Sequence, residues 1–118
     1  MATAYEAREH LRNKRWSFAG VQRLGAKSVS ANATLTIDDA EMVYFDASGS
    51  AFTVLLPASP FEGLCYWLSE NAGSANNVSI DGNGKNINGI AAFAMAAAFQ
   101  QRRIRYNGTE WRITGAVL

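Results

Sequence analysis

The chain has 118 residues, of which 48% are hydrophobic and 18% charged, and this composition excludes a wholly disordered chain. The length allows one hydrophobic core rather than two. The net charge of +1 conceals an uneven layout, with +4 on residues 1–27, −6 on residues 28–100 and +3 on residues 101–118. A basic arm on an acidic body suits a subunit that docks on its own copy or on an acidic neighbour, but simple solvated charges explain the layout equally well.

Residues 1–27 are expected to form an arm, which we treat as separate from the β-domain of residues 28–118. Thr3 and Glu6 have the spacing of a capping box, and small or apolar residues follow at helical spacing, so the arm is short-helical or extended. Four large or basic residues then follow without a clean period: Arg15, Trp16, Phe18 and Arg23. This pattern is typical of an arm that buries its aromatics on a partner, and equally of one that folds back on its own body.

From residue 28 onward, short apolar segments alternate with turn clusters, which predicts strands. No helix-length segment separates them, so an α/β topology is disfavoured. We expect a mainly β fold, a single antiparallel β-sandwich or barrel of the jelly-roll kind. The expected strands are Ser28–Ser30, Thr34–Ile37, Met42–Asp46, Ala51–Leu56, Leu64–Ser69, Val78–Asp81, Asn86–Ile90, Ala92–Phe99, Gln101–Tyr106 and Thr109–Thr114.

Two segments do not alternate. Leu64–Leu68 and Ile90–Phe99 are continuously apolar, which predicts burial on both faces, with the second face covered by the arm or by another subunit. The alanine content of the second run also fits a buried helix, but we expect a strand. Cys65, the only cysteine, lies in the first run and is expected to be a buried, inert thiol.

The last two expected strands form a hairpin with a clear separation of apolar and charged faces. Asn107-Gly108 is suited to a two-residue type I′ turn. The resulting register pairs Tyr106 with Thr109, Arg105 with Glu110, Ile104 with Trp111, and Arg103 with Arg112. One face is then apolar (Ile104, Tyr106, Trp111, Ile113) and the other charged (Arg103, Arg105, Glu110, Arg112).

Catalysis is not expected, because the single cysteine and the single histidine, His10, cannot build a zinc cluster or a conventional triad. Asp81-Gly-Asn83-Gly resembles the opening of a calcium loop, but Ala92 stands where an EF-hand places its glutamate, so a tight turn is favoured. We therefore expect no metal and no cofactor. The amino terminus lacks the apolar core of a secretory signal, and the longest apolar run is too short to span a membrane, so we expect neither secretion nor a membrane partner.

Nucleic-acid binding is a further possibility, since four arginines lie near one another on the final hairpin: Arg102, Arg103, Arg105 and Arg112. The acidic middle of the chain weighs against it. A subunit contact or a solvated face is the preferred use of these arginines, with Arg105 and Glu110 as a cross-strand pair.

The sequence between Asp46 and Trp111 resembles a module of structural proteins in tailed-bacteriophage virions, such as fibres, spikes and head-decoration subunits. The segments that carry this resemblance are Asp46-x-Ser48-Gly49, Phe52-Thr53-Val54-x-Leu56-Pro57-Ala58-Ser59-Pro60-x-x-Gly63, Asn76-Asn77-Val78-x-Ile80-Asp81-Gly82-Asn83-Gly84-Lys85-x-Ile87-x-Gly89 and Tyr106-Asn107-Gly108-Thr109-Glu110-Trp111. The resemblance implies a β-rich virion component, commonly trimeric, without catalytic residues. The two continuously apolar runs depart from the usual alternation and favour a tightly packed oligomer.

The leading hypothesis is a capsid decoration (cement) protein, assembled in the host cytoplasm and located in the virion. It would bind the major capsid protein of a phage head as a homotrimer, with no nucleic-acid or membrane partner. The expected interface residues are Arg15, Trp16, Phe18, Arg23, Tyr66, Trp67, Phe93, Met95, Phe99, Arg103 and Arg105. The first alternative is a tail fibre, baseplate or receptor-binding tip subunit. A more distant one is a glycan-binding β-module that stacks sugars on Tyr5, Trp16 or Tyr44.

Overall fold

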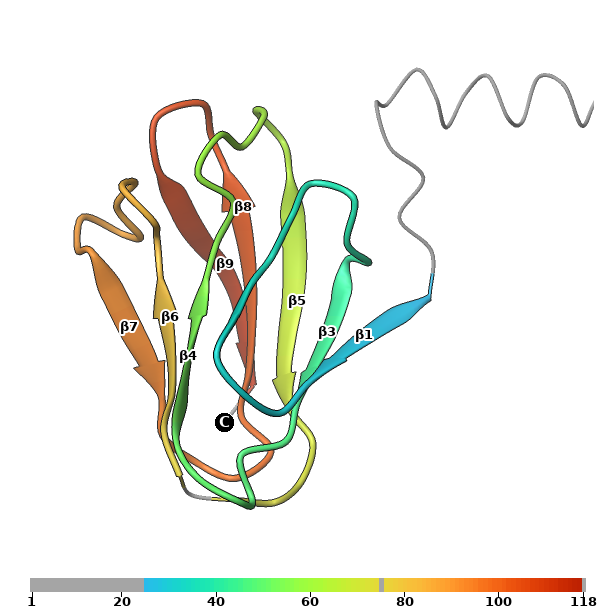
Figure 1. Cartoon of the computed structure of the whole chain (residues 1–118). Helices are drawn as coiled ribbons and strands as arrows, with labels where there is room; N and C mark the ends of the chain where they lie inside the picture. The colour runs from blue at the N-terminus through green and yellow to red at the C-terminus, as the bar shows by residue number, and fades with distance from the viewer. Residues whose placement is uncertain (1–24, 75, 118) are drawn as a thin grey trace, which may run out of the picture.

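The computed structural model describes residues 25–74 and 76–117, and all regular structure within them is β-strand (Figure 1). The strands are β1 Ala26–Val29, β2 Ala33–Thr34, β3 Met42–Phe45, β4 Phe52–Leu55, β5 Cys65–Glu70, β6 Val78–Asp81, β7 Ala92–Met95, β8 Gln101–Tyr106 and β9 Trp111–Val117. The described residues contain no helix that is long and apolar enough to cross a membrane. The arm expected at residues 1–27 lies almost entirely outside the described residues.

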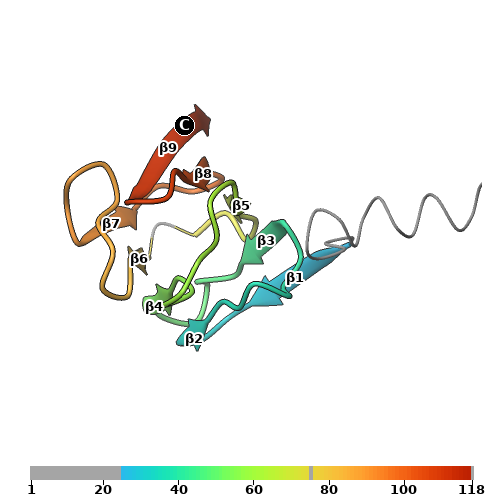
Figure 2. The same cartoon turned by 90° about the horizontal axis from the view of Figure 1, so that it is seen from above.

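The strands form two sheets, one in the order β1-β3-β5-β8-β9 and one in the order β2-β4-β6-β7 (Figure 2). From β1 to β6 the chain changes sheet after every strand, and neighbours within each sheet run parallel. A parallel pair needs a crossover connection, and here the strand in the opposite sheet supplies it. Residues 26–81 therefore wind as three coils of a short two-sheet β-solenoid.

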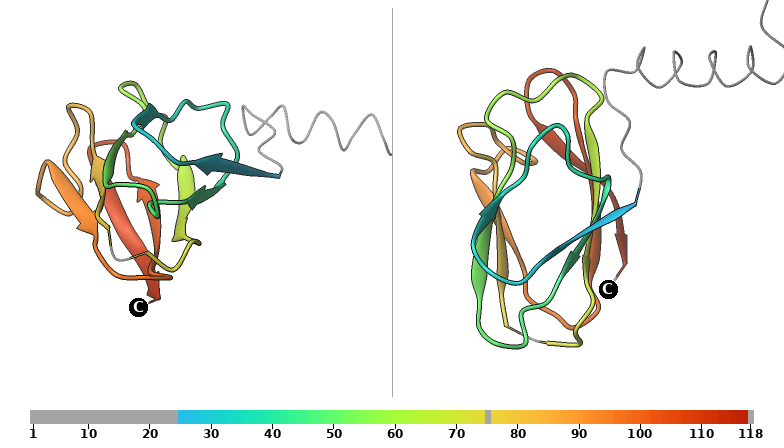
Figure 3. Two further views of the ribbon diagram at one scale, coloured as in Figure 1. Left: turned by 60° about the horizontal axis from the view of Figure 1, so that its bottom comes forward. Right: turned by 45° about the vertical axis from the view of Figure 1, so that its right-hand side comes forward.

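Antiparallel strands close one end of this solenoid. After β6 the chain adds β7 antiparallel to β6, then returns to the other sheet with β8 antiparallel to β5 and β9 antiparallel to β8 (Figure 3). The expectation of a mainly β fold is confirmed, and the strands form two sheets, but the expectation of an antiparallel sandwich or barrel of the jelly-roll kind is wrong because the pairing is mixed. The sequence pattern of short strands separated by regular turns does not reveal the pairing. It is the same whether the next strand folds back beside its predecessor or crosses to the opposite sheet.

The expected strand Asn86–Ile90 is instead a tight loop, in which Ile87 and Ile90 exchange backbone hydrogen bonds of 2.6 and 3.0 Å. The strand expected from Ala92 to Phe99 ends at Met95, and the helical alternative is wrong for this segment. The Gln100 side chain stops the strand, because its Oε1 accepts hydrogen bonds from the backbone N–H groups of Ala96 and Ala97.

Alternate side chains of both sheets point into a common core. Rows of them stack from coil to coil, since Ala33, Val54, Ile80 and Phe93 share one register on the four-stranded sheet. Trp111 is fully buried and packs against the rings of Tyr66 and Tyr106, at centroid distances of 5.9 and 5.4 Å. The core therefore joins the solenoid to the closing hairpin.

The final hairpin has the predicted faces but not the predicted register. Its loop spans residues 107–110, with Gly108 at φ +96°, and Tyr106 pairs with Trp111 rather than with Thr109. The Asn107 side chain shapes the loop, since its Oδ1 accepts from the N–H groups of Thr109 and Glu110. Because the shift is two residues, the same side chains still point inward. The expected Arg105–Glu110 pairing is absent, and Glu110 instead pairs with Arg112 at 3.0 Å.

A buried carboxylate holds two loops together at one end of the sandwich. Glu70 is 1% exposed, and its two oxygens accept hydrogen bonds from the backbone N–H groups of Ala72, Gly73 and Phe99 at 2.8, 3.1 and 2.9 Å. The first two donors belong to the loop after β5 and the third to the loop before β8. Glu70 thus fixes the position of the β7–β8 connection relative to the solenoid.

A second carboxylate closes the first coil. Asp39 accepts a hydrogen bond from the backbone N–H of Thr36 at 2.7 Å and forms an ion pair with Lys27 of β1 at 3.0 Å. Partial burial opposes ionisation of Asp39, but the Thr36 and Lys27 contacts together outweigh it and lower its pKa below the ordinary value of 3.8.

Replacing Glu70 by Ala is expected to destabilise the protein by more than about 2 kcal/mol, because three backbone donors lose their acceptor. Glu70→Gln keeps one acceptor oxygen and should lose less. Urea unfolding followed by tryptophan fluorescence measures both. Glu62→Ala, at an exposed glutamate, is the matched control and should leave the midpoint nearly unchanged; equal midpoints for all three variants would contradict this role of Glu70.

The Asp39 contacts should stabilise the protein only where the carboxylate is ionised. Because the pKa of Asp39 is lower in the folded protein, its ionised carboxylate contributes stability that is fully present above pH 3.8. This stability is lost as the pH falls through the folded-state pKa. Asp39→Asn should therefore lower the urea midpoint at neutral pH, and the difference from the wild type should shrink in acid. Asp38→Asn, at the exposed neighbouring position, is the control. A difference that grew toward acid would contradict the assignment.

Candidate assembly surfaces

The first candidate surface is the apolar edge, defined here as residues 90–99 along β7. Strand β7 is the outer strand of the four-stranded sheet, and no described strand pairs with its free side. Ile90 and Phe99, at the two ends of the apolar edge, are 54% and 62% exposed, and most of the alanines between them are exposed as well. No charged residue occurs between Lys85 and Arg102. The chain thus presents an uncharged, apolar strand edge.

Such an edge is a template for pairing with another strand. Monomeric proteins usually protect their edge strands with lysine, proline, a bulge or a covering segment. None of the first three protects β7. Within the described residues, the second face of the Ile90–Phe99 run is also uncovered. The expectation that another chain or the arm covers this run stays a prediction.

The second candidate surface is the basic face, defined here as Trp67, Arg103, Arg105, Arg112 and Gly115 on the outer side of β5, β8 and β9. The guanidinium carbon of Arg103 lies over the Trp67 ring, 5.7 Å from its centroid. Gly115 lies beside this stack, where an added Cβ would make ordinary van der Waals contacts of 3.5 Å with Arg103 and 3.6 Å with Trp67. The indole is therefore held against the sheet beneath a cation.

Arg103 also covers the thiol of Cys65. Its Nε donates to Cys65 Sγ at 3.4 Å, and Cys65 is 6% exposed although it points to the outer face. Burial raises the pKa of the Cys65 thiol above 9.0 and Glu41 adds to this, while Arg103 opposes it. The outward-facing residues of the run Leu64–Leu68 are Cys65 and Trp67, and the chain's own Arg103 contacts both of them.

The structure separates the expected interface residues. Tyr66 and Met95 are fully buried in the chain's own core, and Phe93 packs against that core. Trp67, Arg103 and Arg105 share the basic face. Phe99 stands apart from them at one end of the apolar edge. Arg15, Trp16, Phe18 and Arg23 lie outside the described residues.

Sequence patterns missed Gly115 of the basic face and two side chains that lie next to this face on β3. Gly115 gives no signal by itself, because its place beside Trp67 and Arg103 follows from strand pairing that the sequence does not show. Met42 and Tyr44 extend the same side of the sheet on β3, half-buried in the register positions beside Trp67 and Ser69. The sequence shows that they alternate with the apolar residues Val43 and Phe45. It does not show that β3 lies next to β5.

Metal binding finds no support in the described residues, which contain no cluster of three or more His, Cys, Asp or Glu side chains. The segment Asp81-Gly82-Asn83-Gly84 forms the favoured turn, in which Asp81 Oδ1 accepts from the N–H of Asn83 at 2.7 Å. A Cβ at Gly82 would collide with the carbonyl oxygen of Lys85. Asn83 also donates to the carbonyl of Leu56 on the neighbouring coil, at 3.0 Å.

Comparison of the sequence with models of protein families gives no match. The curated proteins searched contain no match either.

The geometry around Cys65 makes a prediction about its titration. The wild-type thiol should titrate above its ordinary pKa of 9.0, and Arg103→Gln should raise that pKa further, because it removes the cation that favours the thiolate. Thiolate absorbance against pH measures both. Arg112→Gln, on the same face but paired with Glu110, should leave the titration unchanged. A wild-type pKa at or below 9.0 would contradict the burial argument.

Proposed function

We propose that this chain is a virion structural protein of a tailed bacteriophage, a capsid decoration subunit that assembles with copies of itself and binds the outer surface of the major capsid protein. The uncharged apolar edge at β7 is the observation that carries the assembly part of the proposal. The phage location rests on the resemblance of the segments between Asp46 and Trp111.

Self-association through the apolar edge would satisfy two needs at once. It would pair the free backbone groups of β7, and it would remove Ile90 and Phe99 from water. The small alanine side chains between them would allow two chains to approach closely. A trimer is the oligomer that the resemblance suggests.

Binding to the capsid is assigned to the basic face. Arg105 is exposed there, and Arg103 is presented on the indole of Trp67. Arginine and aromatic residues are the types that most often dominate binding energy at interfaces, and an acidic partner surface would complement their charge. The basic segment of residues 1–27 would add to the same attraction, so binding should weaken as salt increases.

The oligomer is tested with a single added charge. Ala94→Lys places a lysine on the exposed side of β7 and should convert the oligomer to monomer, measured by light scattering on the full-length chain. Thr53→Lys adds the same charge on the central strand β4 of that sheet, and the oligomer should persist. A monomeric wild-type chain, or an oligomer retained in Ala94→Lys with an unchanged mass, would overturn the assembly assignment.

Capsid binding is tested separately by co-sedimentation with expanded empty capsids. The wild-type chain should sediment with capsids and protect them against heat and low salt, whereas Arg105→Glu should bind at least about tenfold more weakly at low salt. Lys85→Glu, an equal charge change outside the basic face, should bind as the wild type does. Failure of the wild type to bind capsids, together with binding to host cells, would favour the tail-tip alternative.

A further inference from the structure

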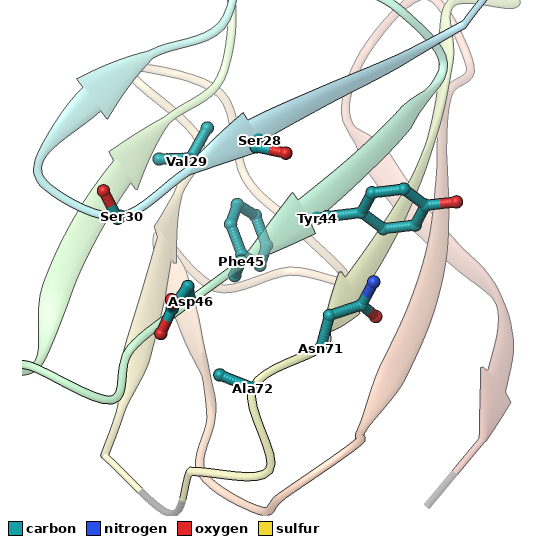
Figure 4. A pocket seen from close by; sticks show the side chains of 8 residues that line it. All are labelled: Ser28, Val29, Ser30, Tyr44, Phe45, Asp46, Asn71 and Ala72. Carbon is teal, nitrogen blue, oxygen red and sulfur yellow. The ribbon is translucent and has the colours of Figure 1, made fainter.

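A cleft lined by both polar and apolar residues lies at the carboxyl ends of the parallel strands β1, β3 and β5, apart from the apolar edge. Its volume is about 380 Å³, within the lower part of the range of about 300–1,000 Å³ that is usual for ligand pockets. Eight residues line it, as Figure 4 shows: Ser28, Val29, Ser30, Tyr44, Phe45, Asp46, Asn71 and Ala72. Such a volume suits a ligand of one or two small rings.

Backbone hydrogen bonds between neighbouring strands fix the frame of the cleft. Backbone hydrogen bonds of 2.9 Å join Asp46 to Val29 and Asn71 to Phe45, so the three chain segments leave their strands in a set arrangement. Val29 and Phe45 are buried members of the core and anchor these strand ends from within. The cleft is therefore built on the hydrogen-bonded strand ends of the solenoid.

Hydrogen bonds from neighbouring residues hold two of the polar side chains in place. The hydroxyl of Ser69 donates to Asn71 Oδ1 at 2.7 Å, and within residues 25–74 and 76–117 the Asn71 amide N–H groups have no acceptor. Ser48 donates to Asp46 Oδ1 through both its hydroxyl and its backbone N–H, at 2.6 and 2.9 Å, and leaves Oδ2 as an acceptor. These hydrogen bonds lower the pKa of Asp46, so its carboxylate stays ionised in mild acid.

Tyr44 supplies an aromatic wall. Its ring is half-buried on the outer side of β3, and Figure 4 shows the Asn71 amide and the Ser28 hydroxyl on the same side of the cleft as this ring. Asp46 and Ser30 lie toward the other side. The lining thus combines two aromatic residues, Tyr44 and Phe45, with one amide, one carboxylate and the hydroxyl groups of Ser28, Ser30 and Tyr44.

This combination favours a neutral polyhydroxylated ligand. Hydroxyl groups of a sugar both donate and accept, so they match the mixed set of Asn71, Ser28 and Asp46, while the apolar face of a pyranose ring matches an aromatic wall. An anionic ligand would meet the Asp46 carboxylate, and a cationic ligand would find only one charge.

We propose that this cleft binds a neutral saccharide, with Tyr44 packing against the sugar ring and with Asn71 and Asp46 hydrogen-bonding its hydroxyl groups. This activity is separate from self-association and from capsid binding, and it gives the chain a third functional surface, directed at glycans. It does not depend on the proposed function.

The test uses the full-length chain and ligand-observed saturation-transfer NMR. The probes are the methyl glycosides of glucose, galactose, mannose, rhamnose and N-acetylglucosamine, with methylguanidinium as the cationic comparison, each at millimolar concentration. At least one glycoside should receive saturation, and Tyr44→Ala and Asn71→Leu should each weaken its binding by about tenfold or more. Tyr44→Phe keeps the ring and should retain most of the affinity.

Thr34→Ala is the matched control, because Thr34 lines a separate hollow of about 290 Å³ on the opposite sheet. It should bind as the wild type does, and thermal melting of every variant checks that each one folds. The proposal is overturned if no glycoside receives saturation from the wild type. It is also overturned if binding survives in both Tyr44→Ala and Asn71→Leu, or if methylguanidinium alone binds.

Discussion

The parallel stacking of one coil on the next is the constraint on which the rest of this structure depends. Each strand from β1 to β6 must hold its register against its neighbour in the same sheet, while the chain crosses to the opposite sheet between them. Inner side chains consequently form continuous rows, such as Phe52, Val78 and Met95. The connections between strands differ in length, but the rows do not shift, because a one-residue slip would turn a whole strand inside out.

The way in which the solenoid ends decides which surfaces are available. Antiparallel strands close the last coil, and they leave β7 and β9 as the outer strands at that side. The outer faces of the two sheets differ. The five-stranded sheet carries the Trp67–Arg103 stack, and the four-stranded sheet carries mainly small uncharged side chains around Thr53 and Ala94. The two sheets thus present chemically unlike outer faces.

Carboxylates hold the loops of this small fold. Asp39, Asp46 and Glu70 each accept backbone N–H groups in a connection that has no regular structure of its own. Because strands of four residues contribute few ladder hydrogen bonds, these loop contacts complete the hydrogen bonding of the strand ends. The Asp46 contacts also hold one polar side chain of the proposed saccharide site in place.

The sequence by itself determined where most strands lie and which side chains point inward. Both follow from a period of two along each strand, which is why Ile104, Tyr106 and Trp111 were placed on the inner face even though the hairpin register was two residues off. Only the tertiary structure decided that β1, β3 and β5 run parallel, that Arg103 covers Cys65, and that Tyr44 and Asn71 share a cleft. Strand direction and pairing depend on contacts between residues far apart in the chain, and local residue patterns do not encode them.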